Sequence, residues 1–142
     1  MEETQEKSLH RETAKIEIAA TPTPFTALDP ELQLAFKCIS EKKGENIVGL
    51  DLRDIASFTE YFVIASGTNQ RQVQAIADEI NEQLKKQLGS RPVRIEGYNS
   101  AEWVLLDYGD FIVHIFNGEA RGFYDLARLW WDARKVELPA EL

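Results

Sequence analysis

The sequence has one cysteine, two histidines and no long apolar run. A single cysteine, Cys38, cannot form an internal disulfide bond or build a cysteine-based zinc site, and this sparse usage suits a reducing compartment. The longest unbroken apolar run is Tyr61–Ala65, whereas a helix needs about 20 apolar residues to cross a bilayer. These shortages favour a cytoplasmic protein that makes no membrane contact.

Basic residues are also in short supply. The chain has 16 Lys and Arg against 24 Asp and Glu, which gives a formal charge of −8. Because binding to a phosphate backbone requires a basic face, we expect no direct nucleic-acid binding. A basic protein surface is the better-matched partner. The length of 142 residues, with 44% hydrophobic and 28% charged residues, fits one globular domain with an extension.

The N-terminal segment 1–27 differs in composition from the rest of the chain. It contains scattered Glu, Lys and Arg residues and ends near a Thr-Pro-Thr-Pro run at 21–24. It lacks the apolar segment of a secretory signal, and its acidic residues argue against an organelle transit peptide. We predict a disordered extension over 1–27, a folded domain over 28–138 and a short C-terminal tail over 139–142.

Hydrophobic spacing predicts three helices and five strands. The first helix begins at Asp29-Pro30, the second follows Ser66–Asn69 and closes at Gly89, and the last runs from about Gly122 to Arg134. The strands are expected over 46–52, 61–65, 93–96, 102–107 and 110–116. This order predicts an α/β (α+β) fold in which helices flank a mixed five-stranded sheet, with a parallel crossover around the second helix.

The last two predicted strands, 103–107 and 110–116, are separated only by Tyr108-Gly109. A two-residue link predicts an antiparallel hairpin in which Asp107 faces Asp110. Alternation along the strands then gives an apolar face that must meet helices. The opposite face mixes aromatic, aliphatic and charged side chains: Trp103, Leu105, Asp107, Asp110, Ile112, His114 and Phe116.

Two interpretations of this mixed face remain open from composition alone. It can lie under another helix, with His114 satisfied by a local hydrogen bond and the aspartates at the wet rim. Alternatively, it is an exposed docking surface on which a basic partner relieves the repulsion between paired carboxylates. A tryptophan with aliphatic neighbours and a charged rim has the composition of a binding hot spot.

Catalytic and metal-binding arrangements are poorly supported. The Ser66–Asn69 turn can bind an anion at a helix start, but an N-cap by Thr68 or Asn69 is the favoured interpretation. The strand, Ser-Gly turn and helix are similar to those of nucleotidyltransferases, which hold magnesium with several carboxylates. Here only Glu96, Asp107 and Asp110 are candidates, so we expect no metal and no cofactor. Cys38 is assigned to the core.

Aromatic residues in the last predicted helix suggest a possible contact between copies of the chain. Trp130 and Trp131 lie about 100° apart on a helix, so both cannot face the same core. Trp130 continues the apolar stripe, whereas Tyr124 and Trp131 lie on a neighbouring strip. These two side chains are candidates for self-association, or for covering the Thr/Pro segment.

The run from Glu96 to Asp110, Glu-Gly-Tyr-Asn-Ser-Ala-Glu-Trp-Val-Leu-Leu-Asp-Tyr-Gly-Asp, resembles the ribosomal silencing factor (Iojap) family. The similarity continues through His114 and, later, through Glu119, Arg121, Tyr124 and Leu126. Upstream, Leu50-Asp51-Leu52 and the segment 61–67 match as well. The resemblance covers about residues 28–138 and leaves the N-terminal extension outside it.

This resemblance implies a small α/β fold related to nucleotidyltransferases but without their catalytic carboxylates, and thus a protein that is not an enzyme. It also implies binding to a ribosomal protein on the intersubunit face of the large subunit, where the small subunit is kept from joining. Family members often form homodimers. The alternatives are a magnesium-dependent nucleotidyl or phosphoryl transferase and a plain dimerisation module.

On the docking interpretation, each residue of the mixed face has an expected role. Trp103 and Leu105 would anchor the partner, and Asp107 and Asp110 would meet its lysine or arginine residues. The remaining three residues would extend the surface: Ile112, His114 and Phe116.

Overall fold

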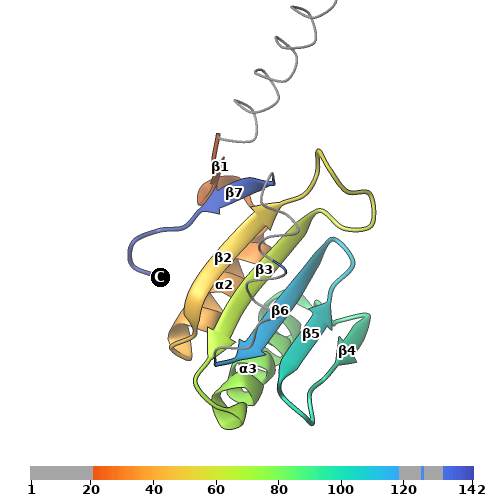
Figure 1. The fold of residues 1–142 in the computed structure, drawn as a ribbon. Helices are drawn as coiled ribbons and strands as arrows, with labels where there is room; N and C mark the ends of the chain where they lie inside the picture. The colour runs from red at the N-terminus through yellow and green to blue at the C-terminus, as the bar shows by residue number, and fades with distance from the viewer. Residues whose placement is uncertain (1–20, 119–125, 127–132) are drawn as a thin grey trace, which may run out of the picture.

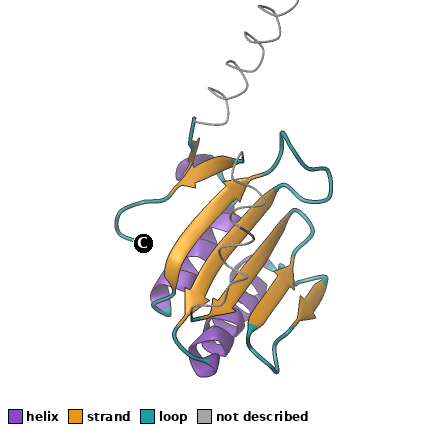
Figure 2. Cartoon of the chain, in the orientation of Figure 1, coloured by secondary structure: helices purple, strands orange, loops and turns teal. Residues whose placement is uncertain are grey.

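The computed structural model describes residues 21–118, 126 and 133–142. Its described part is built on a seven-stranded sheet in the order β1-β7-β2-β3-β6-β5-β4, with helices α2 and α3 packed on one face (Figures 1 and 2). The helices span Pro30–Glu41 (α2) and Gln70–Leu88 (α3), and a 3-10 turn, η1, spans Phe25–Ala27. The strands are β1 (Thr23–Pro24), β2 (Glu45–Asp51), β3 (Tyr61–Gly67), β4 (Arg94–Glu96), β5 (Trp103–Asp107), β6 (Phe111–Asn117) and β7 (Arg134–Glu137).

Helix α2 begins where the sequence predicts it. Pro30 occupies the first turn, where its missing N–H costs no hydrogen bond. Asp29 is the N-cap in an extended conformation, but its side chain makes no capping bond, and its carbonyl accepts from the Gln33 amide. Leu32, Ala35, Phe36 and Ile39 are buried as expected, and so is Cys38.

Helix α3 has the predicted cap at each end. The side chain of Asn69 accepts a hydrogen bond from the Gln72 amide at 2.8 Å, and Gly89 leaves the helix in the left-handed conformation with φ of +64°. Leu88, which the helical spacing assigns to the buried stripe, is instead 40% exposed. The rest of the stripe is buried as predicted: Val73, Ile76, Ala77, Ile80 and Leu84.

The strand order explains which elements are buried on both faces. Strand β3 pairs with β2 on one side and with β6, in parallel, on the other, and all of its residues are buried, as its continuous apolar run predicts. Strand β4, which follows α3, has the same direction as β3, as the predicted crossover requires. It does not lie beside β3, however, because β6 and β5 occupy the positions between them.

The β5–β6 hairpin forms, but its predicted register is wrong by two residues. Asp107 pairs with Ile112, and Trp103 pairs with Phe116. The two-residue turn is Gly109-Asp110, closed by a hydrogen bond from the Tyr108 amide to the Phe111 carbonyl. Gly109 has φ of +87°, a conformation that glycine adopts at no steric cost. Because a shift of two preserves side-chain alternation, the division into two faces is correct.

The sheet has seven strands, and not the five that were predicted. The additional strands are β1, in the segment assigned to the extension, and β7, which begins at the predicted end of the last helix and continues beyond it. Most of the predicted helix Gly122–Arg134 lies outside the described residues. Leu126, which is helical, and Ala133 are buried as predicted, whereas Arg134 lies in β7.

Residues beyond the expected domain limits of 28 and 138 also contact the core. Thr23 and Phe25 are buried, and Phe25 packs edge-on against Phe36 with ring centroids 5.9 Å apart. At the other end, Leu142 packs against the helix-side core. Phe25 and Leu142 therefore pack against the same core, and the division into extension, domain and tail stays a prediction.

A buried carboxylate holds the N-terminal strand in place. Asp51 accepts hydrogen bonds from Thr23 Oγ1 at 2.7 Å and from the guanidinium of Arg53 at 2.8 and 3.0 Å. Burial would raise the pKa of Asp51, but the hydrogen bonds from Arg53 and Thr23 outweigh that effect and lower the pKa below its ordinary value. The charged carboxylate therefore links β1 to β2.

Replacing Thr23 with valine should reduce the free energy of unfolding by about 1.5–3 kcal/mol, because a hydrogen bond to a buried charge is lost. Urea denaturation measures this change. Thr26→Val provides the control, since Thr26 is exposed and three residues away. Equal stability of the two variants would show that the Thr23–Asp51 bond does not secure the N-terminal segment.

Candidate functional site

Strand β6 separates two apolar cores. On the helix side, Val104, Leu106, Phe111, Val113 and Ile115 pack with α2 and α3. On the opposite side, the mixed face of the hairpin contributes to a second cluster, which includes Leu126 from beyond β6. The other buried members of that cluster are Leu50, Leu52, Phe62, Ile64, Ile112, Phe116 and Ala133.

This second core divides the predicted docking residues into two groups. Ile112, His114 and Phe116 on β6 are all buried, so the prediction that they extend an exposed surface is wrong. Side chains on the same face bury them: Ile112 and Phe116 pack in the second core with Leu126, and the Phe62 ring lies 4.6 Å from that of His114.

The other four predicted residues lie on β5 and at the turn, nearer the edge of the sheet, and remain accessible. Trp103 is 45% exposed, Leu105 and Asp107 are half-buried, and Asp110 is exposed. The accessible site is therefore smaller than the predicted face. It comprises β5 and the turn, and it excludes the surface of β6.

Trp103 is held in a defined orientation although nearly half of it is exposed. Its indole Nε1–H donates to Nδ1 of His114 at 3.0 Å, and its ring lies 5.1 Å from that of Phe116. A large apolar side chain fixed in this way can be buried by a partner with little further loss of conformational entropy. This is the arrangement expected of an interface anchor.

His114 makes the single local hydrogen bond expected of a structural histidine. Burial lowers its pKa from 6.5 to about 4, so the imidazole is neutral at physiological pH. Because Nδ1 accepts from Trp103, the proton resides on Nε2, which has no hydrogen-bond partner among the described residues. A neutral, enclosed histidine of this kind positions Trp103 and does not exchange protons with a substrate.

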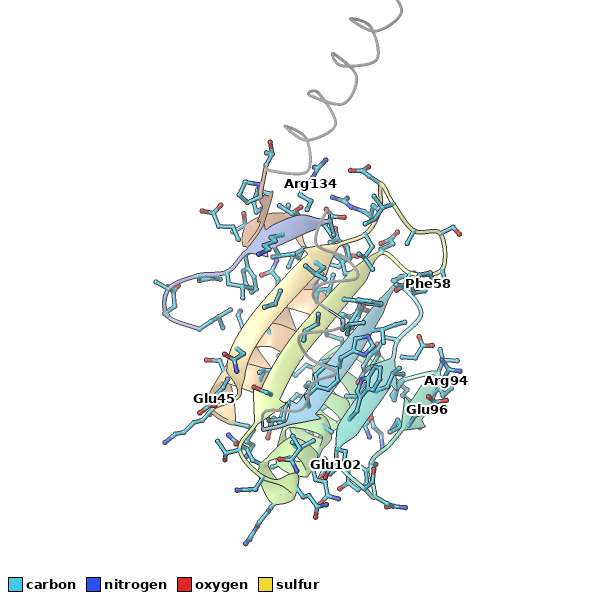
Figure 3. The ribbon with its side chains drawn as sticks, viewed as in Figure 1. Glu45, Phe58, Arg94, Glu96, Glu102 and Arg134 are labelled. Atoms are coloured by element: carbon cyan, nitrogen blue, oxygen red, sulfur yellow. The ribbon has the colours of Figure 1, made fainter. Side chains whose placement is uncertain are left out.

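Asp107 and Glu96 are occupied by local contacts. Asp107 accepts from the Gly109 amide at 2.8 Å, and Arg94 lies 3.5 Å from both Asp107 and Glu96. Arg94 and Glu96 project from the outer edge of the sheet at β4 (Figure 3). Since Asp107 pairs with Ile112, the proposed repulsion between Asp107 and Asp110 as paired residues does not occur. No group of three metal-ligating side chains occurs within the described residues.

The Ser66–Asn69 turn uses its polar groups internally. Gln72 Oε1 accepts from the amide and hydroxyl of Thr68 at 2.7 and 2.9 Å, and Asn69 caps the Gln72 amide. The capping interpretation is therefore confirmed.

Cys38 is buried, and burial raises the pKa of its thiol to about 11, so it is not a reactive nucleophile.

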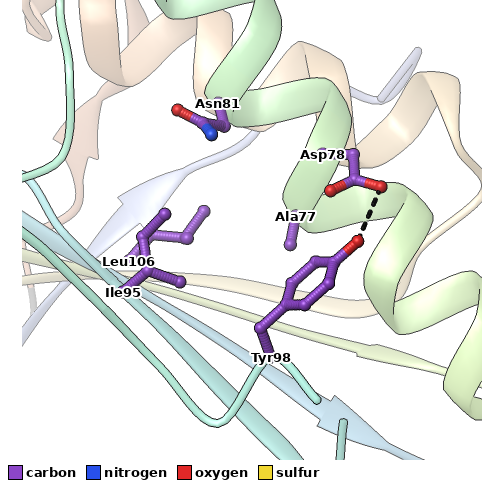
Figure 4. Close-up of a pocket in the computed structure, with 6 residues that line it drawn as sticks. All are labelled: Ala77, Asp78, Asn81, Ile95, Tyr98 and Leu106. Carbon is purple, nitrogen blue, oxygen red and sulfur yellow. Dashed lines mark hydrogen bonds between the residues drawn. The ribbon is translucent and has the colours of Figure 1, made fainter.

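A shallow pocket lies between α3 and the β4–β5 edge. It has a volume of about 230 Å³ and is lined by Ala77, Asp78, Asn81, Ile95, Tyr98 and Leu106. The hydroxyl of Tyr98 donates to Asp78 at 3.0 Å across its rim (Figure 4). This bond pairs the hydroxyl and the carboxylate of the lining, and the pocket offers no convergent set of catalytic side chains.

Two residues near the site were not singled out for it from the sequence. Arg94 neutralises Asp107 and Glu96, and Phe58, in the loop before β3, is 59% exposed. The sequence signal for Phe58 is an aromatic residue within a segment whose composition is typical of a turn.

The candidates for self-association, Tyr124 and Trp131, lie outside the described residues.

Comparison with known proteins assigns the chain to a family. The family model described as "Ribosomal silencing factor during starvation" matches residues 26–142. The chain belongs to this family of ribosomal silencing factors, which are ribosome-associated regulators and not enzymes. The resemblance noted at the hairpin is thereby confirmed.

Within the described residues, no helix is long and apolar enough to span a membrane.

Individual relatives agree with this assignment. The chain is 43% identical to the ribosomal silencing factor of Halalkalibacterium halodurans over 107 residues, which is 75% of this chain and 91% of the relative. It is 34% identical to the chloroplastic Iojap protein of maize, covering 83% of this chain and 54% of that protein. A crystal structure from Bacillus halodurans superposes with a TM-score of 0.67 at 40% identity, covering 75% of this chain and 96% of the other.

The low pKa of His114 predicts a specific pH dependence of stability. Between pH 6.5 and about 4, the unfolded chain binds a proton at His114 and the folded chain does not. The free energy of unfolding should therefore fall by up to about 1.4 kcal/mol for each pH unit of acidification in this window. Urea denaturation across the window measures the slope.

His114→Asn is the matched variant, since its amide oxygen can still accept from Trp103 but does not titrate. Its unfolding free energy should lack this component of the slope. Identical slopes for the variant and the wild-type protein would contradict the assignment of a buried, neutral His114.

Proposed function

We propose that the protein binds a basic protein on the intersubunit face of the large ribosomal subunit and thereby prevents the small subunit from joining. Translation is repressed because the two subunits cannot associate. The observation that supports this proposal is the half-exposed, immobilised indole of Trp103 on β5, next to the edge strand of a sheet whose central strands are buried. The names of the relatives supply the ribosome as the target.

The surroundings of Trp103 favour a protein partner over RNA. Glu102 and Asp110 are exposed, and Asp107 is half-buried beside Arg94. Together with the formal charge of −8, these carboxylates would repel a phosphate backbone and attract lysine and arginine side chains. Leu105, on the same face as Trp103, adds apolar area next to the anchor.

The proposed mechanism is steric. A standard interface buries about 800 Å² on each partner, an area that a folded unit of this size can provide. If the covered patch is one where the subunits bridge, occupancy alone blocks joining and no chemical step is required. The arrangement of the site fits this mechanism, because His114 is neutral and Asp107 is paired with Arg94.

Two further aspects belong to the same proposal. The protein would act in the cytoplasm, where the subunits meet, and free copies would associate as homodimers. Tyr124 and Trp131 remain the candidate residues for self-association from the sequence. The two copies would separate on docking if each binds the ribosome more tightly than it binds the other copy.

Trp103→Ala should weaken binding to purified large subunits by about 30-fold or more, the loss typical of an interface hot spot. Cosedimentation with large subunits over a range of protein concentrations measures this change. Circular dichroism and thermal unfolding verify that the variant is folded. Wild-type affinity of a folded Trp103→Ala protein would refute the assignment of β5 as the docking strand.

Charge reversal at the turn provides an independent test. Asp110→Lys should slow association with large subunits, because the partner is proposed to be basic, and the difference should shrink at high salt. Glu137→Lys makes the same charge change on exposed β7, toward the other edge of the sheet, and should retain the wild-type rate. Equal rates for the two variants would contradict a basic partner at the hairpin.

A further inference from the structure

The mixed face of the sheet carries a row of ring contacts that connects two exposed aromatic side chains. Phe58 lies 6.0 Å from Phe62, and Phe62 lies 4.6 Å from His114. His114 in turn lies 5.8 Å from Trp103. The two inner rings are buried, whereas the outer two, Phe58 and Trp103, are 59% and 45% exposed. These four side chains, Phe58, Phe62, His114 and Trp103, form a ring row that runs from the loop before β3, across β3 and β6, to β5.

The loop that presents Phe58 is fastened to the turn of the β5–β6 hairpin. Thr59 Oγ1 donates to the Gly109 carbonyl at 3.0 Å, and the amide of Glu60 donates to the Asp110 carbonyl at 2.9 Å. Thr59 is buried although its neighbours Phe58 and Glu60 are exposed. The position of Phe58 relative to the hairpin is therefore set by hydrogen bonds as well as by ring packing (Figure 3).

Carboxylates lie alongside this row. Glu60 and Asp110 are exposed at the junction of the loop and the turn, and Asp107 lies at the end of β5. An aromatic side chain at each end with acidic residues nearby is complementary to a protein surface that presents apolar patches and basic side chains. RNA would be repelled by the carboxylates, and a second copy of this acidic chain would match the charge poorly.

We propose that Phe58 is a second anchor of the docking surface, so that the basic partner spans the ring row from Trp103 to Phe58. This inference rests on the proposed function and specifies the extent of its interface. Three ring contacts of 6.0 Å or less link the two anchors, whereas a standard interface patch is roughly 30 Å across. One partner surface can therefore cover both.

The exposed apolar residues at the β4 edge of the sheet are weaker candidates for a second anchor. Val93, just before β4, and Ile95, within β4, are also exposed. Ile95 faces the helix side, where it lines the pocket with Ala77 and Tyr98. A partner centred on Trp103 would have to wrap around the edge strand to reach them, whereas Phe58 belongs to the same face as Trp103.

The test compares Phe58→Ala and Phe58→Lys with the wild-type protein in cosedimentation titrations with purified large subunits. Phe58→Ala should weaken binding about tenfold, and Phe58→Lys should weaken it further by adding a charge that repels a basic partner. Leu88→Ala is the matched control, because Leu88 is also an exposed apolar residue but lies at the end of α3. It should bind like the wild-type protein. Thermal unfolding verifies that each variant is folded.

The outcomes separate this inference from the proposed function. Wild-type affinity of both folded Phe58 variants, together with weakened binding by Trp103→Ala, would overturn the second anchor and leave the docking strand intact. Unchanged binding by the Trp103 variant as well would overturn the proposed function itself. A change in self-association, measured by sedimentation velocity, with unchanged ribosome binding would also overturn the inference, since Phe58 would then contact a second copy.

Discussion

The parallel pairing of β3 with β6 is the constraint on which the rest of the structure depends. It places β6 in the interior of the sheet, with the helix-side core on one face and the second core on the other. The polar and aromatic residues of β6 are consequently enclosed, and β5, nearer the sheet edge, keeps a half-exposed tryptophan. The hydrogen bond from Trp103 to His114 then connects the buried core to the accessible side chain.

Local patterns predict much of this fold. The caps and apolar stripes of α2 and α3, the buried run of β3 and the two faces of the hairpin all follow from spacing and from turn residues. The hairpin register was missed because the sequence offers two overlapping two-residue turns, and Gly109 with its positive φ selects Gly109-Asp110 over Tyr108-Gly109. Strands β1 and β7 were missed because they are short and pair only with distant segments.

The sequence predicts the two faces of the hairpin but not how much of the mixed face is accessible. Alternation along the strands identified the face, and composition made Trp103 its candidate anchor by analogy with binding hot spots. Alternation cannot show how far a covering segment reaches, so Ile112, His114 and Phe116 were placed on the surface although Leu126 packs into the same cluster. Phe58 joins the face through tertiary ring contacts, which no local pattern records.

Electron cryo-microscopy of the wild-type protein bound to purified large subunits tests the central claim most directly. The account predicts density for the protein on the intersubunit face, with the Trp103 indole enclosed against a basic ribosomal protein and the helices α2 and α3 turned away from it. A complex in which Trp103 faces solvent, or in which the protein lies outside the area that the small subunit covers, would contradict the account.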